Sequence, residues 1–63
     1  MDNLKQLRKN TKFSQEEMAR TLNISLRAYQ LKEKGESELK LSELMILADK
    51  FEMKLTDFIN RIV

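Results

Sequence analysis

The sequence contains no cysteine, histidine, proline or tryptophan, and Gly35 is its only glycine. Without cysteine, neither a disulfide framework nor a thiolate metal site is possible, and an intracellular setting is natural. Without histidine, the most common acid–base residue and metal ligand is missing. A glycine-rich phosphate loop and an evident pair of catalytic carboxylates are missing too. We therefore expect a protein that is not an enzyme and that needs no metal or cofactor.

Strong charge of one sign and long apolar runs are also missing. Twelve basic against ten acidic residues give a formal charge of +2, which supports nucleic-acid binding only weakly. No apolar run reaches the length of a membrane span, and the N-terminus is too polar for a signal peptide. A chain of 63 residues without linkers or repeats predicts one domain over residues 1–63, without a membrane partner, in the cytoplasm of a bacterium or of a cell infected by a bacterial virus.

The stretch from 14 to 35 has the pattern of two short helices joined by a tight turn. Ser14 predicts an N-cap, because its hydroxyl can accept a backbone N–H of the first turn. Glu17 lies three residues later and can reach back to the N–H of Ser14, which would complete a capping box. Asn23 then suits a left-handed turn position.

The second helix of this stretch has a start and a stop signal of its own. Ile24 is apolar and can fill the corner between the helices, and Ser25 is a second candidate N-cap. Gly35 supplies the left-handed residue that commonly follows the end of a helix. Two helices joined by a four-residue turn form the helix-turn-helix plan.

The remaining apolar positions predict three more helices. In the first, capped by Asp2 or Asn3, we expect Leu4, Leu7 and Thr11 to face inward. After the loop 36–40, a further helix has Lys40 before its start, so we expect fraying there or a cap from Ser42. Its inward residues would be Leu41, Leu44, Met45, Leu47, Ala48 and Phe51, and those of the last helix Leu55, Phe58, Ile59 and Ile62.

The segments SQEEMA, IS and KEKG resemble the Cro and phage-repressor (xenobiotic-response-element) helix-turn-helix family. The resemblance extends to residues 4–8, which match the first helix of that family, and to residues 41–59, which match its fourth and fifth. It implies an all-α, compact five-helix bundle of the lambda-repressor-like DNA-binding type, with helices 2 and 3 forming the helix-turn-helix. The implied function is a Cro/C1-type transcription regulator, a repressor that binds double-stranded DNA.

The resemblance also assigns a structural role to two charged residues. An arginine at the position of Arg8 typically pairs with a glutamate at the position of Glu33 in this family, so it implies an Arg8–Glu33 ion pair. The alternative is that both side chains face water. By angle around the second motif helix, Tyr29 and Lys32 fall on the inner side. We expect Tyr29 in the core with its hydroxyl at the edge, and the Lys32 ammonium reaching out to water.

The outer side of the same helix predicts base contacts from Arg27, Gln30, Leu26 and Leu31. The guanidinium fork of Arg27 matches the two acceptors of guanine and lies in the first helical turn. Gln30 can bind adenine or a phosphate, and the two leucines offer contact only to thymine methyl groups. Because the family usually has polar residues at both leucine positions, the leucines are alternatively part of a protein-binding surface.

Four residues are candidates for contacts with DNA phosphates. The resemblance assigns this role to Gln15, at the start of a helix whose N-terminus favours an anion. Lys12 stands where the family often has glycine, so its backbone is expected to be either strained or differently shaped. Its side chain is either a phosphate contact or an ordinary solvated lysine. Lys34 and Lys40 flank the acidic loop, whose carboxylates would repel phosphate unless they point away.

Two partners other than DNA follow from these patterns. One small domain buries too little DNA surface for useful selectivity, so we expect a homodimer on a palindromic site. The predicted dimer interface is Phe58, Ile59, Ile62 and Val63, unless these residues complete the core or lie disordered. The alternative function is a protein-interaction module on the same fold, antitoxin-like or anti-repressor-like, that holds a regulatory protein partner with the two leucines and the acidic loop.

Overall fold

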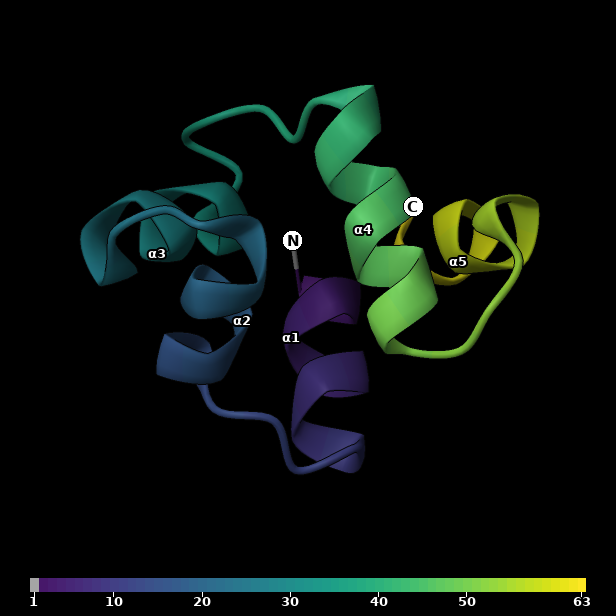
Figure 1. Ribbon diagram of the computed structural model, residues 1–63. Helices are drawn as coiled ribbons and strands as arrows, with labels where there is room; N and C mark the ends of the chain where they lie inside the picture. Colours follow the sequence, from purple (N-terminus) through teal and green to yellow (C-terminus); the bar gives the residue numbers. More distant parts are fainter. Residues whose placement is uncertain (1) are drawn as a thin grey trace.

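The computed structural model describes residues 2–63, which fold into five α-helices without any strand (Figure 1). The helices are α1 (Asp2–Asn10), α2 (Gln15–Leu22), α3 (Leu26–Lys34), α4 (Leu41–Lys50) and α5 (Leu55–Ile62). α1 packs against α3 and α5, whereas α4 packs against α2 and α5. The predicted all-α, five-helix fold is confirmed, with α2 and α3 as the helix-turn-helix.

The predicted ends of the two motif helices are confirmed. Ser14 Oγ accepts the Glu17 N–H at 3.0 Å, and Ser25 Oγ accepts the Ala28 N–H at 3.1 Å. Asn23 and Gly35 adopt left-handed φ values of 57° and 86°. These capping groups satisfy backbone atoms that have no partner within the helix, so the short helices end where the sequence indicates.

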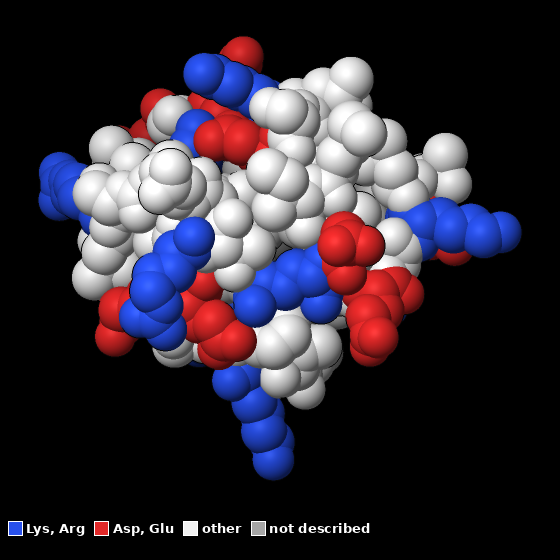
Figure 2. Space-filling view, in the orientation of Figure 1, with Lys and Arg blue, Asp and Glu red and all other residues white. Residues whose placement is uncertain are grey.

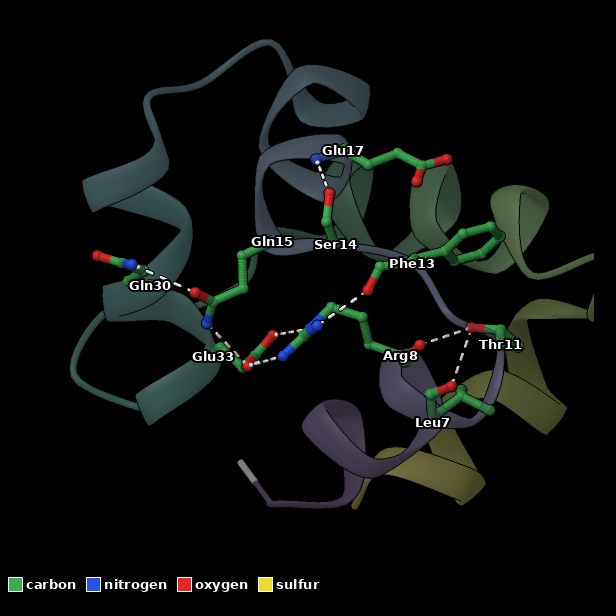
Figure 3. A network of polar contacts seen from close by, with 9 residues as sticks. All are labelled: Leu7, Arg8, Thr11, Phe13, Ser14, Gln15, Glu17, Gln30 and Glu33. Atoms are coloured by element: carbon green, nitrogen blue, oxygen red, sulfur yellow. Dashed lines mark hydrogen bonds and ion pairs between the residues drawn. The ribbon is translucent and has the colours of Figure 1, made fainter.

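One half of the predicted capping box is wrong. The Glu17 carboxylate turns away from the Ser14 backbone (Figure 3). Its Oε2 lies 3.2 Å from Lys50 Nζ on α4. A charged partner on a neighbouring helix has replaced the local contact. The same lysine ammonium lies 4.5 Å from the centre of the Phe13 ring, so it ties α4 to the α1–α2 turn as well.

Two other predictions about helix ends are wrong. Asp2 and Asn3 both lie inside α1, so neither is its cap. α4 begins at Leu41, and Glu43 rather than Ser42 repairs its start, because Glu43 Oε1 accepts the Lys40 N–H at 2.8 Å.

Thr11 is a separate correction, because it is exposed rather than inward. Its hydroxyl lies 3.0 Å from each of the Leu7 and Arg8 carbonyl oxygens at the end of α1. The threonine hydroxyl therefore bonds back to carbonyl groups of the last helical turn while the side chain stays exposed.

The buried apolar residues form one cluster between the helices. Phe58 and Leu47 are fully buried in it, and the phenyl rings of Phe13, Phe51 and Phe58 follow one another with centroids 5.3 and 5.6 Å apart. Aromatic rings at this spacing contribute beyond the apolar area they bury. The cluster consists of Leu4, Leu7, Met18, Ala19, Leu22, Tyr29, Leu47, Ala48, Phe58 and Ile62.

Some apolar residues of α4 are covered differently from the prediction, whereas Phe58 and Ile62 of α5 face inward as predicted. Leu41 is 62% exposed and Met45 is 54% exposed, so neither is an inward residue. In α5, by contrast, Phe58 and Ile62 are buried, since α5 packs against both α1 and α4. Two of the four residues predicted as a dimer interface, Phe58 and Ile62, therefore lie in the core, which is the alternative stated for them; the interface itself stays a prediction.

Lys12 and Glu52 occupy left-handed turn positions, with φ values of 64° and 56°. A left-handed conformation crowds the Cβ atom of any residue other than glycine, at a cost on the order of 1 kcal/mol. The two strained residues lie in the turns that follow α1 and α4. At Lys12, the structure thus contains the strained backbone that the missing family glycine predicts.

Candidate nucleic-acid interface

The outer side of α3 is the part of the motif that the core leaves uncovered. Arg27 is exposed and Leu26 is 38% exposed, whereas Gln30 and Leu31 are half-buried. Within residues 2–63, Arg27 makes no hydrogen bond or ion pair. Its guanidinium is thus available to a ligand, in the first turn of the helix.

A chain of polar contacts runs from this face into the protein (Figure 3). Gln30 Nε2 donates to Gln15 Oε1 at 3.2 Å, and Gln15 Nε2 donates to Glu33 Oε1 at 3.1 Å. Glu33 receives two further bonds from Arg8, from Nε to Oε2 at 2.8 Å and from Nη2 to Oε1 at 3.1 Å. Arg8 Nη1 also donates to the Phe13 carbonyl at 2.9 Å.

The structure therefore contains the Arg8–Glu33 ion pair that the family resemblance implies, buried and with two parallel bonds. The link through Gln15 to Gln30 was not foreseen from the sequence. Two glutamines on neighbouring helices of a helix-turn-helix are the only available signal, and it is a weak one. Because its amide is engaged on both sides, Gln15 acts first as a brace between α2 and α3.

The charges of this network stabilise one another. Burial alone would raise the pKa of Glu33, but hydrogen bonds, led by that of Arg8, hold it below its usual range. The hydrogen bond to Glu33 raises the pKa of Arg8 in turn, against the effect of burial. A buried charge is tolerated only when it is paired in this way, so the pair fixes α1 against the end of α3.

Tyr29 lies deeper than predicted. Its side chain is fully buried, and its hydroxyl is enclosed beside Glu33 rather than at the edge of the core. Among the described residues the hydroxyl finds no hydrogen bond of standard geometry. Burial, followed by the nearby Glu33 carboxylate, raises its pKa, so Tyr29 stays neutral at physiological pH.

The Lys32 ammonium also differs from the prediction, since it does not reach water. Its Nζ lies 3.2 Å from Glu43 Oε1 and donates to the Glu38 carbonyl at 3.0 Å. Burial alone would raise the pKa of Glu43, but hydrogen bonds from the Lys40 backbone and from Lys32 hold it below its usual range. The end of α3 is therefore tied to the loop 36–40 and to the start of α4, and Lys32 is unavailable to DNA.

The remaining candidate phosphate contacts are spread over the surface. Lys12, Lys34 and Lys40 are exposed, and so are Glu36 and Glu38. Figure 2 shows cations interspersed with acidic and uncharged groups on the visible face, without a continuous basic area. The charge distribution therefore favours contact at particular points over general attraction for nucleic acid.

Lys34 also lines a polar groove of about 420 Å³ between α1 and α3. Gln15, Gln30 and Glu33 of the network border the same groove, together with Asp2 and Lys5. The network is thus reachable from solvent along one side, and a cation stands on each wall of the groove.

In a comparison with known protein families, the model of a family described as helix-turn-helix matches residues 4–58. The chain belongs to the Cro/C1-type helix-turn-helix family. Members of this family are DNA-binding regulators, in which the second helix of the motif lies in the major groove. No curated protein and no solved structure gives a significant match. Among the described residues, no helix is long and apolar enough to cross a membrane.

Membership of the family identifies the outer face of α3 as the candidate DNA-binding surface. A DNA-binding regulator of this type binds double-stranded DNA through its helix-turn-helix. In this chain the corresponding surface begins at Leu26 and Arg27 and is braced from behind by Gln15. The network of Figure 3 reaches this surface at Gln30.

Proposed function

We propose that this protein is a sequence-specific transcriptional repressor that binds a palindromic site in double-stranded DNA as a homodimer. α3 enters the major groove, and Arg27 reads a guanine through its two parallel N–H donors. The observation that supports this proposal best is an exposed Arg27 without an internal partner, in the first turn of the helix that the family uses for recognition.

The neighbours of Arg27 have graded roles. Gln30 donates one amide N–H to Gln15, which leaves its carbonyl oxygen for a donor group of a base and its second amide N–H for a base or a phosphate, so it reads DNA from a fixed position. Leu26 is exposed enough to contact a thymine methyl group, whereas the half-buried Leu31 contributes at the edge. The order of contribution is therefore Arg27 first, Gln30 second and the leucines last.

Phosphate contacts hold the domain on the duplex. The first backbone N–H groups of α2, beginning at Gln15, can donate hydrogen bonds to a phosphate, because a helix leaves these donors without partners within the helix. Lys12, Lys34 and Lys40 add exposed cations, while the carboxylates of the loop 36–40 oppose them. We expect a moderate affinity that falls as the salt concentration rises.

The size of the domain supports binding in pairs. Its longest dimension is 26 Å, whereas successive major grooves on one side of B-DNA are about 34 Å apart. One copy reads one half-site only. Two copies related by a two-fold axis read both halves of a palindrome, which multiplies the number of specified base pairs.

The test is selection from a randomised duplex library at low salt, with wild type, Arg27→Ala and Arg61→Ala side by side. Arg61 is an exposed arginine on α5, so its variant removes the same charge away from α3. We expect wild type and Arg61→Ala to enrich one palindrome, and Arg27→Ala to lose its preference at one base pair of each half-site.

Two results would contradict the proposal. If a folded wild type enriches no sequence, sequence-specific DNA binding is not its function. The protein-interaction alternative then applies, and the exposed Leu26 becomes the first residue to test. If Arg27→Ala enriches the wild-type site unchanged, the assignment of base reading to Arg27 is wrong.

A further inference from the structure

Two leucines on the outer side of α3 lie outside the apolar core. Leu26 is 38% exposed and Leu31 is half-buried. Within residues 2–63, neither belongs to the core cluster or to the partly buried apolar residues packed against it. Ile24, in the turn before α3, does pack against that cluster. The core therefore does not require the apolar character of Leu26 or Leu31.

Leu26 is the first residue of α3 and directly precedes Arg27. The Ser25 hydroxyl accepts the Ala28 N–H at 3.1 Å, so the first turn that contains both residues is held in place. Consecutive Cα atoms are about 3.8 Å apart, close to the spacing of about 3.4 Å between successive base pairs. When Arg27 reads a guanine, Leu26 therefore faces the neighbouring base pair.

A leucine side chain can distinguish base pairs by only one group. It has no donor or acceptor, so it would displace water from the polar edge of a base without replacing the lost hydrogen bonds. The C5-methyl group of thymine is the apolar group that the major groove presents, and burying it against a leucine is favourable. 5-Methylcytosine presents the same methyl group at the same ring position. Leucine thus senses the methyl group and not the base that bears it.

We propose that Leu26 reads the C5-methyl group of a pyrimidine in the base pair next to the guanine of Arg27, so that methylation of a cytosine there strengthens binding. Thymine and 5-methylcytosine are both bound better than their counterparts without the methyl group, uracil and cytosine. The inference rests on the proposed function, because Leu26 meets a base only when α3 lies in the major groove.

The residues one turn further along α3 leave this role to Leu26. Gln30 lies on the same side as Leu26, but its amide donates to Gln15 at 3.2 Å and offers only polar groups to a base. Leu31 lies one turn from Arg27 and is half-buried, so it has less surface to give to a methyl group. Leu26 is the more exposed leucine and the one next to Arg27.

The experiment measures the affinity for four versions of the selected duplex by fluorescence anisotropy. The base pair next to the guanine contains thymine or uracil opposite adenine, or 5-methylcytosine or cytosine opposite guanine. Each pair of duplexes differs by one methyl group, so the two sources of that group are tested separately. The proteins are wild type, Leu26→Ala, Leu31→Ala and Leu41→Ala. Leu41 is 62% exposed on α4, so its variant makes the same change away from α3.

We expect the methyl group to tighten binding of wild type about fourfold in both pairs of duplexes. In Leu26→Ala both ratios should fall to about one, whereas Leu41→Ala should keep the wild-type ratios; circular dichroism checks that each variant is folded. A wild-type ratio of one in either pair overturns the proposal. So does a ratio that Leu26→Ala leaves unchanged, or one that Leu31→Ala or Leu41→Ala abolishes equally.

Failure of this inference is distinguishable from failure of the proposed function. A wild type that selects a site but ignores the methyl group supports the function and contradicts the inference. A wild type that selects no sequence contradicts the function. Methyl reading is then measured on the unselected library, with uracil in place of every thymine in one sample. Equal affinity for both samples overturns the inference, and a preference for thymine that Leu26→Ala abolishes supports it.

Discussion

The two parts of the chain on either side of Gly35 share one apolar core but differ in the polar contacts that add to it. Residues 2–35 are joined by a buried polar network, in which the Arg8–Glu33 pair links α1 to α3 and Gln15 links α2 to α3. Residues 36–63 rely on apolar packing, with the phenyl ring of Phe58 at the centre. They also leave apolar side chains exposed on α4, which the first part does to a smaller degree.

This difference separates the orientation of α3 from the association of subunits. Hydrogen bonds and ion pairs are directional, so they fix how α3 stands relative to α1 and α2. Apolar contacts are not directional, and an apolar surface in excess is suited to a second subunit. The part that contains the helix-turn-helix is thus the more precisely oriented of the two.

Breaking the Arg8–Glu33 pair tests the first part most severely. In Arg8→Ala, the Glu33 carboxylate stays buried without its main partner, so we expect a loss of about 3–5 kcal/mol in the free energy of unfolding. A domain of this size has little more stability than that. Urea denaturation followed by circular dichroism measures the change.

Lys50→Ala is the matched comparison, because it removes a cation whose partner Glu17 is partly exposed. The Lys50 and Glu17 side chains are 19% and 40% exposed, against 9% and 4% for Arg8 and Glu33. We expect a loss of less than about 1 kcal/mol. Equal losses in the free energy of unfolding would show that the buried pair stabilises the fold no more than the partly exposed pair.

Acid should weaken the protein through the same carboxylates. Glu33 and Glu43 have pKa values below their usual range in the folded state, so each stabilises the fold above the ordinary glutamate pKa of about 4.3. That stability is lost as the pH falls through the lower folded pKa. Unfolding free energies measured from pH 7 to pH 2 should therefore stay level at first and drop below about pH 4.

Glu43→Gln sharpens the comparison between the two parts. It removes one titrating group, at the junction of α3 and α4, and leaves the Arg8–Glu33 pair in place. We expect a shallower acid slope in this variant than in wild type. An unchanged slope would mean that Glu43 contributes nothing to the acid sensitivity.

The acidic loop between the two parts should reduce DNA affinity. Glu36 is exposed beside the end of α3, so Glu36→Gln removes repulsion from phosphate and should tighten binding about two- to threefold at low salt. The gain should shrink as salt is added. Fluorescence anisotropy with the selected duplex measures it, and Glu52→Gln, in the α4–α5 turn, is the charge-matched control. An equal gain in the control would locate the effect in net charge alone.

The smallest expected effect concerns the turn after α1. Lys12 has a left-handed backbone, so Lys12→Gly should relieve strain and raise the free energy of unfolding by about 0.5 kcal/mol. Lys9→Gly, inside α1, should lower it by about 1 kcal/mol. Denaturation of both variants measures the contrast, and a loss of stability in Lys12→Gly would refute the strain argument.

The parts of the fold that depend on neighbouring residues could be predicted from the sequence. Ser14, Ser25, Asn23 and Gly35 act on backbone atoms within a few residues, and they end the helices where the pattern indicated. The Arg8–Glu33 contact joins residues 25 positions apart in the sequence, so local patterns could not predict it and only the family resemblance did.

The errors arose where distant elements compete for the same side chain. Periodicity placed Leu41 and Phe58 on apolar faces, but it does not say which face another helix covers. The Lys32 ammonium was expected in water, because the carbonyl of Glu38 and the carboxylate of Glu43 meet it only after the loop has folded back. The base contacts remain predictions for the same reason, since they depend on a partner outside the chain.

The bond between Gln30 and Gln15 has a consequence for how binding specificity can evolve. If Gln30 contacts a base as proposed, a substitution there also disturbs Gln15, and through it Glu33, so a new base preference needs a compensating change on α2 or costs stability. Within the described residues, Arg27 makes no hydrogen bond or ion pair that a substitution would break. Lineages that acquire new target sites should therefore diverge first at Arg27, while Gln15 and Gln30 change together and later.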